Sequence, residues 1–160
     1  MYKIVMLSAG LLLGLIISRL FFFIMKVDTE SMAPNLKTGD RILVSRFASA
    51  GKGDIVAVES PADEGRLVLS RIIASEFETV EIRNRVVFIN DTAANFKWNT
   101  LKEGNSIYPM KFTYRDNMPP VKLGKDEYFL LGDNFDSSYD SRTIGAVPEK
   151  LIEGRIIYKR

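Results

Sequence analysis

Two polar stretches of this 160-residue chain carry side chains that could do chemistry. In "TESMAPNLKTGD" (29–40), Ser31 begins the tetrapeptide Ser-Met-Ala-Pro, and "LLGDNFDSSYDSRTIGAVP" (130–148) is rich in Asp and Ser. A serine hydroxyl is a good nucleophile only when a neighbouring base takes its proton. The chain has no His and no Cys, which excludes Ser–His–Asp sites, cysteine nucleophiles and zinc–thiolate sites. A hydrolase of this composition must activate its serine in another way.

Each stretch also has a purely structural interpretation. Ser-Met-Ala-Pro is typical of a turn in which the serine hydroxyl caps the backbone. "GDNFDSSYDSR" (132–142) is typical of an Asx-rich loop after a strand. Their occurrence together, after an apolar N-terminal segment and in a strand-rich chain, favours the chemical interpretation.

The elements that would position these stretches are short strands. Several segments are rich in Val, Ile, Leu, Phe or Tyr and are bounded by Gly, Asp, Asn or Pro. They predict a mainly β, antiparallel domain with strands over 40–48, 53–60, 66–74, 79–90, 127–133 and 153–159. "IRNRVVFIND" predicts a hairpin that turns at Asn84. The stretch 91–125 contains Trp98, Pro119 and Pro120, and predicts an irregular excursion or a small second lobe.

The N-terminal segment predicts a membrane anchor over residues 1–25, ahead of a domain over 26–160. Apolar residues run through 4–18, and "LFFFIM" (20–25) continues them after Arg19. The span slightly exceeds the roughly 20 residues that cross a bilayer. A cleaved signal peptide would need small residues at its end, and a core helix would need a polar face; the segment shows neither. Lys3, Arg19 and Lys26 leave its orientation open.

The charge balance argues against a nucleic-acid partner. The net charge is +2, from 22 basic and 20 acidic side chains, without a run of like charges. The absence of His and Cys removes most transition-metal sites, and we expect no cofactor and no metal.

The motifs resemble those of type I signal peptidases, the membrane-bound serine endopeptidases that cleave signal peptides from exported proteins. "TESMAPNLKTGD" is similar to their nucleophile box, S-G-S-M-x-P-T-L-x-x-G-D. "GKGDIVAV" (51–58) resembles their R-G-D-I-V strand, and "LIEGRI" (151–156) resembles their closing I-x-G-R strand. "GDNFDSSYDSRTIGAV" resembles G-D-N-R-D-N-S-x-D-S-R-x-x-G-x-V. The absence of large insertions is similar to the short, Gram-positive form.

The resemblance implies a role for each matching position. Ser31 would be the nucleophile, with Thr29 donating to the oxyanion hole. Ser138 would orient the base, and an ion pair would brace the site. The residues of that pair are Asp140 and Arg142. The residues implied to line the pocket for small substrate side chains are Val27, Met32, Leu36 and Leu69.

The general base is missing at the position where the resemblance places it. The family pattern is Y-[VI]-K-R-[VI]-I-G-x-P-G-D-x-V-E, and "LVLSRIIASEFETVE" (67–81) aligns with it. The lysine falls on Ser70, and the G-x-P-G-D turn falls on 74–78. A neutral serine hydroxyl is not a base. Loss of a general base costs about 10²–10⁴ in rate.

Two functions therefore stay open. The first is an active serine endopeptidase that uses another base; Lys26 and Lys111 have apolar neighbours. The second, which we favour, is a catalytically impaired homologue that binds signal peptides or exported preproteins, or assembles surface or pilus proteins. The resemblance implies a single-pass protein of the plasma (inner) membrane that contacts the lipid bilayer and has its β domain on the extracytoplasmic side.

Overall fold

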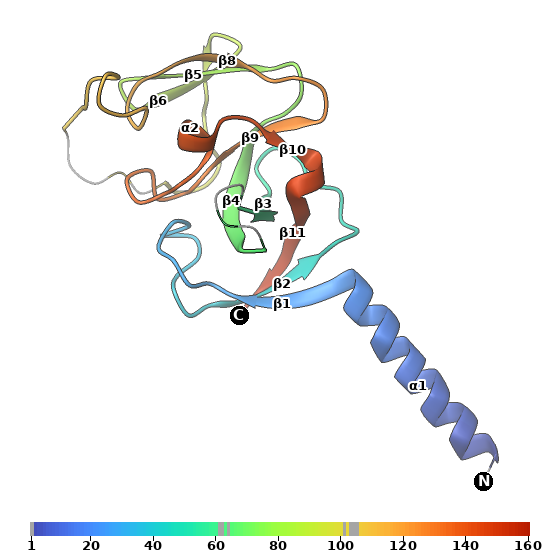
Figure 1. Ribbon diagram of the computed structural model, residues 1–160. Coiled ribbons are helices and arrows are strands. Elements are labelled where there is room, and N and C mark those ends of the chain that lie inside the picture. Colours follow the sequence, from blue (N-terminus) through green and yellow to red (C-terminus); the bar gives the residue numbers. More distant parts are fainter. Residues whose placement is uncertain (1, 61–62, 64, 101, 103–105) are drawn as a thin grey trace.

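The computed structural model describes residues 2–60, 63, 65–100, 102 and 106–160. It contains a long N-terminal helix, α1 (Tyr2–Phe21), and two β-sheets. Figure 1 shows α1 projecting away from the sheets, with the smaller sheet at the opposite end of the molecule. Every strand pairing in the described part of the chain is antiparallel. The predicted fold class, mainly β and antiparallel, is confirmed.

The larger sheet has seven strands in the order β1-β2-β11-β3-β4-β9-β10. Their bounds are β1 Phe22–Lys26, β2 Arg41–Ser45, β3 Ile55–Glu59, β4 Leu67–Ala74, β9 Glu127–Leu131, β10 Val147–Pro148 and β11 Ile152–Lys159. The short helix α2 (Ser141–Ile144) and the 3-10 turn η1 (Glu149–Leu151) lie between β9 and β11 in sequence. The predicted strands 40–48, 53–60, 66–74, 127–133 and 153–159 correspond to β2, β3, β4, β9 and β11.

The smaller sheet has four strands in the order β7-β6-β5-β8. They are β5 Thr79–Arg83, β6 Val86–Ile89, β7 Thr92–Ala93 and β8 Met118–Lys122. The predicted hairpin is β5–β6, and its two-residue turn has positive φ at Asn84 (48°) and Arg85 (67°). Positive φ at both central residues is the geometry of a type I′ hairpin turn.

The stretch 91–125 contains more regular structure than we predict from its prolines. Strand β8 includes Pro119 and Pro120, and β7 lies at the start of the stretch. Proline is tolerated in a strand at the edge of a sheet, where its missing N–H leaves no ladder bond unmade. Strand β8 is such an edge, because β5 is its only neighbour in the described sheet.

The apolar N-terminal span does not continue as one element through residue 25. Helix α1 ends at Phe21, and Phe22–Lys26 forms β1, which pairs with β2 from Phe22↔Ser45 to Lys26↔Arg41. Phe and Ile favour strands, and the open edge of β2 supplies the hydrogen bonds. Among the residues that the structure describes, no helix combines the length and the apolar character needed to cross a membrane.

Three groups of buried side chains make up the core, and one of them lies under the Ser31 segment. That group consists of Val27, Met32, Leu36, Ile42, Val44, Ala57 and Leu69. The members of this group come from the loop after β1 and from β2, β3 and β4. The group contains all four residues that were predicted to line a substrate pocket. The other two groups fill the smaller sheet and the junction of β3, β4 and β9.

Candidate active site

Ser31 lies in the loop between β1 and β2, which is closed at its base by backbone hydrogen bonds. The N–H of Val27 donates to the carbonyl of Asp40 at 2.9 Å, and the N–H of Gly39 donates to the carbonyl of Val27 at 2.8 Å. Ser31 is half-buried, and its Oγ lies 2.9 Å from the Oγ1 of Thr29. The structure thus brings the predicted nucleophile and the predicted oxyanion-hole hydroxyl into direct contact.

The backbone of Ser31 is held by the segment that follows β9. Its carbonyl accepts a hydrogen bond from the N–H of Asn134 at 2.9 Å and another from the hydroxyl of Ser138 at 3.0 Å. The Ser138 hydroxyl also contacts the carbonyl of Asn134. Ser138 therefore holds the loop that carries Ser31 in place. The Ser138 hydroxyl makes its hydrogen bonds with these two backbone carbonyls.

Gly132 allows this close contact. A Cβ at this position would lie 1.8 Å from the Ser138 Oγ and 2.7 Å from the Ser31 carbonyl oxygen. Real Cβ atoms do not approach other atoms so closely, so a side chain would push the two loops apart. The glycine of the G-D-N motif is required by this packing rather than by an unusual φ.

We expect Gly132→Ala to separate the Ser31 loop from the Ser138 loop. Forcing an extra methyl group into such a packed site costs about 1–3 kcal/mol, so the thermal midpoint should fall. Gly124→Ala is the matched control, because a Cβ there would meet only the flexible carboxyl end of Glu127. A Gly132→Ala protein as stable as the Gly124→Ala protein would contradict this packing.

Asp140 organises the end of the second polar stretch. Its Oδ2 accepts from the N–H of Gly132 at 3.0 Å, and its Oδ1 accepts from the N–H of Arg142 at 3.2 Å, which caps α2. The Arg142 guanidinium adds bonds of 2.8 and 2.7 Å to the same carboxylate. Both side chains are almost fully buried. The predicted Asp140–Arg142 ion pair is thus present, and it holds Gly132 in place.

A second buried ion pair joins the two halves of the site. The Nε and Nη2 of Arg71, on β4, donate to Asp133 at 2.7 and 2.5 Å, and the Nη1 donates to the Gly53 carbonyl at 2.6 Å. The Nδ2 of Asn35, in the Ser31 loop, donates to Asp133 at 2.9 Å. The guanidinium also lies 4.6 Å from the ring centre of Trp98. Asp133 therefore links β4 to the loop that carries Ser31.

Ser70 directly precedes Arg71 on β4. In the pairing of β4 with β9, Ile72 is opposite Leu130 and Arg71 is opposite Leu131. The next residue along each strand is Ser70 on β4 and Gly132 after β9, and Gly132 packs against Ser31. Ser70 is buried, with 4% of its surface exposed. The position predicted for the base lysine is therefore shielded from water and adjoins Leu69, which packs in the core group under the Ser31 loop.

No lysine is among the hydrogen-bond partners of Ser31, although the described residues include every lysine of the chain. Lys26 and Lys111, the two candidates with apolar neighbours, are exposed to solvent. The pKa of Lys102 is lowered, first by burial of its amine and then by the Arg85 charge. Its Nζ donates to the Arg85 carbonyl at 2.6 Å, so this amine is bound at the β5–β6 turn of the smaller sheet.

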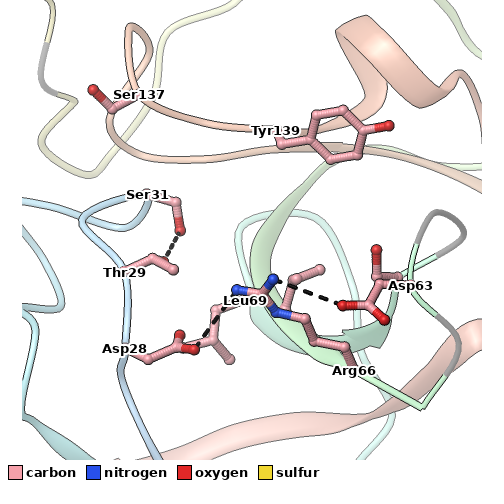
Figure 2. Close-up of a pocket in the computed structure, with 10 residues that line it drawn as sticks. Asp28, Thr29, Ser31, Asp63, Arg66, Leu69, Ser137 and Tyr139 are labelled. Atoms are coloured by element: carbon pink, nitrogen blue, oxygen red, sulfur yellow. Dashed lines mark hydrogen bonds and ion pairs between the residues drawn. The ribbon is translucent and has the colours of Figure 1, made fainter.

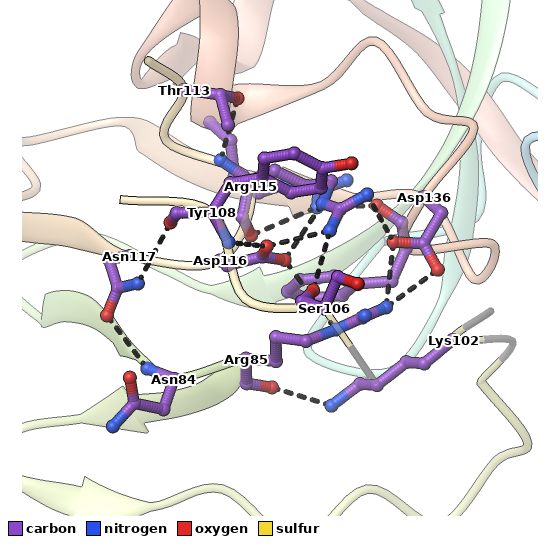
Figure 3. A network of polar contacts seen from close by, with 12 residues as sticks. Asn84, Arg85, Lys102, Ser106, Tyr108, Thr113, Arg115, Asp116, Asn117 and Asp136 are labelled. Carbon is purple, nitrogen blue, oxygen red and sulfur yellow. Dashed lines mark hydrogen bonds and ion pairs between the residues drawn. The ribbon is translucent and has the colours of Figure 1, made fainter. Parts of the chain in front are cut away.

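A network of polar contacts connects the smaller sheet and the stretch before β8 to the loop that carries Ser138 (Figure 3). Arg85, in the β5–β6 turn, donates to both oxygens of Asp136 at 2.6 and 2.7 Å, and Arg115 lies 3.1 Å from the same carboxylate. Asp116 accepts from Arg115 and from the N–H of Tyr108. Burial raises the pKa of Asp116, but these hydrogen bonds outweigh burial and lower it below its usual value. The network fixes the loop two residues before Ser138.

A cleft of about 280 Å³ opens beside Ser31 (Figure 2). Its walls are formed by Asp28, Thr29, Ser31, Ser60, Asp63, Arg66, Val68, Leu69, Ser137 and Tyr139. Of the residues predicted to line a substrate pocket, Leu69 reaches this cleft. Val27, Met32 and Leu36 are instead buried in the core beneath the loop, where they support it from below.

Sequence reasoning missed several residues of this site. Arg71, Asp133 and Asn35 all lie within the matched motifs, yet their mutual contacts join positions 62 and 98 residues apart in sequence. Adjacency to Ser70 was a usable signal for Arg71. Nothing in the sequence pattern pointed to Trp98 or to the charged wall of the cleft formed by Asp28, Asp63 and Arg66.

Comparison with known proteins identifies the family of the chain. The family model described as signal peptidase, peptidase S26, matches residues 1–159. A probable signal peptidase I-1 of Synechocystis is 28% identical, over 98% of this chain and 80% of that protein. A signal peptidase I of Bacillus amyloliquefaciens is 31% identical, over 89% of this chain and 75% of that protein.

The fold has a counterpart among solved structures. The crystal structure of a signal peptidase I from Enterococcus faecalis V583 superposes with a TM-score of 0.53 at 27% identity, covering 69% of this chain and 98% of that one. Family model, relatives and fold agree. The chain belongs to the signal peptidase S26 family.

Proposed function

We propose that the protein binds signal peptides of exported preproteins in the cleft beside Ser31 and that its proteolysis is lost or strongly impaired. The observation that carries this proposal is the environment of the Ser31 hydroxyl: its partner is Thr29, and no lysine of the chain lines the cleft. A neutral hydroxyl cannot accept the proton that attack on a peptide bond releases. The carboxylates of the cleft, Asp28 and Asp63, both pair with Arg66.

The remaining features of the site support peptide binding. The cleft combines apolar surface from Val68 and Leu69 with hydroxyl groups and an open face. The loop that carries Ser31 is fixed by Asn134 and Ser138. Because this loop is already fixed, a peptide can bind there with little further ordering of the loop.

We also propose that binding takes place at the outer face of the plasma membrane. Helix α1 exposes many apolar side chains to solvent, among them Val5, Met6, Leu7, Leu11, Leu12 and Leu20. Exposed apolar surface of this kind favours contact with lipid. The second candidate function, an active endopeptidase, is favoured by the intact contacts of Ser31, Thr29 and Ser138 and requires a base from outside the described cleft.

Binding can be measured by fluorescence anisotropy of a labelled signal peptide with the purified chain. We expect saturable binding that Ser137→Trp weakens by about tenfold or more, because Ser137 is an exposed residue of the cleft and a Trp side chain would fill it. Ser49→Trp is the control, since Ser49 is exposed in a separate depression beside Arg46 and Tyr128. Absence of binding, or equal weakening by both variants, would contradict the proposal.

A further inference from the structure

The cleft beside Ser31 contains an ion pair between its two walls. Asp28 belongs to the wall that carries Thr29 and Ser31, and Arg66 immediately precedes β4, which contributes Val68 and Leu69 to the other wall. The Arg66 Nη2 lies 3.8 Å from the Asp28 Oδ2. Figure 2 shows the Arg66 side chain extended between Asp28 on one side and Asp63 on the other.

We propose that the Arg66–Asp28 pair narrows the cleft by bridging its two walls and that an entering peptide must break this pair. This inference rests on the proposed function, in that the occupant of the cleft is a peptide. The pair spans the space between the Ser31 loop and the start of β4, so an extended chain lying along that space would displace the guanidinium. Arg66 is thereby assigned as the residue that controls access to Ser31.

Asp63 gives Arg66 a second partner. Its Oδ2 lies 3.8 Å from the Arg66 Nη1, and both residues belong to the connection between β3 and β4. When the contact with Asp28 breaks, Arg66 can keep this partner on its own wall. Arg66 therefore keeps a counter-charge after the contact with Asp28 breaks. This lowers the free-energy cost of breaking that contact.

The ion pair across the cleft is weak. The side chains of Arg66, Asp28 and Asp63 are 53%, 62% and 62% exposed. Ion pairs of such exposed groups are screened by salt and contribute little. We therefore expect removal of the pair to change access by about twofold to fivefold, the range available to an exposed ion pair.

The absence of cysteine from the sequence provides a direct test. Ser31→Cys places the only thiol of the full chain in the cleft. Its reaction rates with pyrenyl maleimide, which is bulky and neutral, and with N-ethylmaleimide, which is small and neutral, are measured on the same protein. The ratio of the two rates reports access, because a change in the pKa of the thiol alters both rates alike.

In this background we expect Arg66→Gln and Asp28→Asn each to raise the ratio about twofold to fivefold. The double variant should show no further rise, and 1 M salt should raise the ratio of the parent alone. Asp63→Asn is the matched control: it removes a carboxylate from the same arginine but not the contact across the cleft, so it should not raise the ratio.

Two results would overturn the inference: an unchanged ratio in both variants, or opposite changes in Arg66→Gln and Asp28→Asn, which would indicate a simple effect of charge. All three substitutions are at exposed side chains, and the rate with N-ethylmaleimide together with the thermal midpoint verifies folding. Labelling needs no peptide recognition. A failure of the natural chain to bind signal peptide would therefore overturn the proposed function and leave the result on the ion pair readable.

Discussion

Replacing Ser70 by lysine is expected to give the chain endopeptidase activity at least 10²-fold above that of the natural sequence. The estimate follows from the contribution of a general base, about 10²–10⁴ in rate. Position 70 is the residue before Arg71 on β4, and Arg71 is paired with Leu131, the residue before Gly132. Gly132 packs against the Ser31 backbone, so an amine on a side chain at position 70 would start next to the nucleophile loop.

Burial at position 70 would also tune the amine. Ser70 is 4% exposed, and removal from water disfavours the charged form of lysine and lowers its pKa. An amine that is neutral near physiological pH can take the proton of the Ser31 hydroxyl. Activity of the variant should therefore increase with pH as the amine loses its proton, and reach a plateau above its pKa.

The measurement is cleavage of a preprotein by purified Ser70→Lys protein across a pH series. Ser70→Met is the matched control, because it adds similar bulk at the same position without an amine. Addition of Ser31→Ala to the lysine variant should abolish the gain. A folded Ser70→Lys protein that is no more active than Ser70→Met would show that position 70 does not serve as the base position.

We expect Asp133→Asn to lower the free energy of unfolding by about 3–5 kcal/mol, the cost of removing one partner from a buried ion pair. Asp133 is fully buried and accepts two bonds from Arg71, at 2.7 and 2.5 Å, and one from Asn35 at 2.9 Å. The substitution would remove the counter-charge of the buried Arg71 cation and replace one carboxylate oxygen by an NH2 group, which cannot accept a hydrogen bond from Arg71 or Asn35.

Chemical denaturation followed by circular dichroism measures this loss. Glu153→Gln is the control, because it removes a carboxylate from an ion pair of similar length, 2.8 Å to Arg46, in which the side chains are 33% and 43% exposed. Exposed pairs contribute about 0–1 kcal/mol. Equal losses in the two variants would contradict the central place of Asp133.

Much of the site was predictable because motifs carry it within short segments. Ser31 and Thr29 are two residues apart, and Asp140 and Arg142 are two residues apart, so their contacts depend on local backbone geometry. The strands β2, β3, β4 and β9 were predictable because their apolar side chains alternate or run together between turn residues.

The rest depends on contacts between distant segments. The aromatic run at the end of α1 became strand β1 because β2 offered a free edge, which the run itself does not reveal. Pro119 and Pro120 are accommodated in β8 because that strand lies at an edge. The link from Arg71 through Asp133 to Asn35, and the Arg66–Asp28 pair across the cleft, require the fold to be assembled first.

The most direct test of the proposed function is incubation of the purified natural chain with a preprotein, followed by mass spectrometry of the products. Because Ser31 has Thr29 as its partner and no lysine lines its cleft, we predict that no cleavage at the signal-peptide boundary exceeds that of the Ser31→Ala protein. Clear cleavage by the natural chain that Ser31→Ala abolishes would contradict this account and show that the protein is an active peptidase with another base.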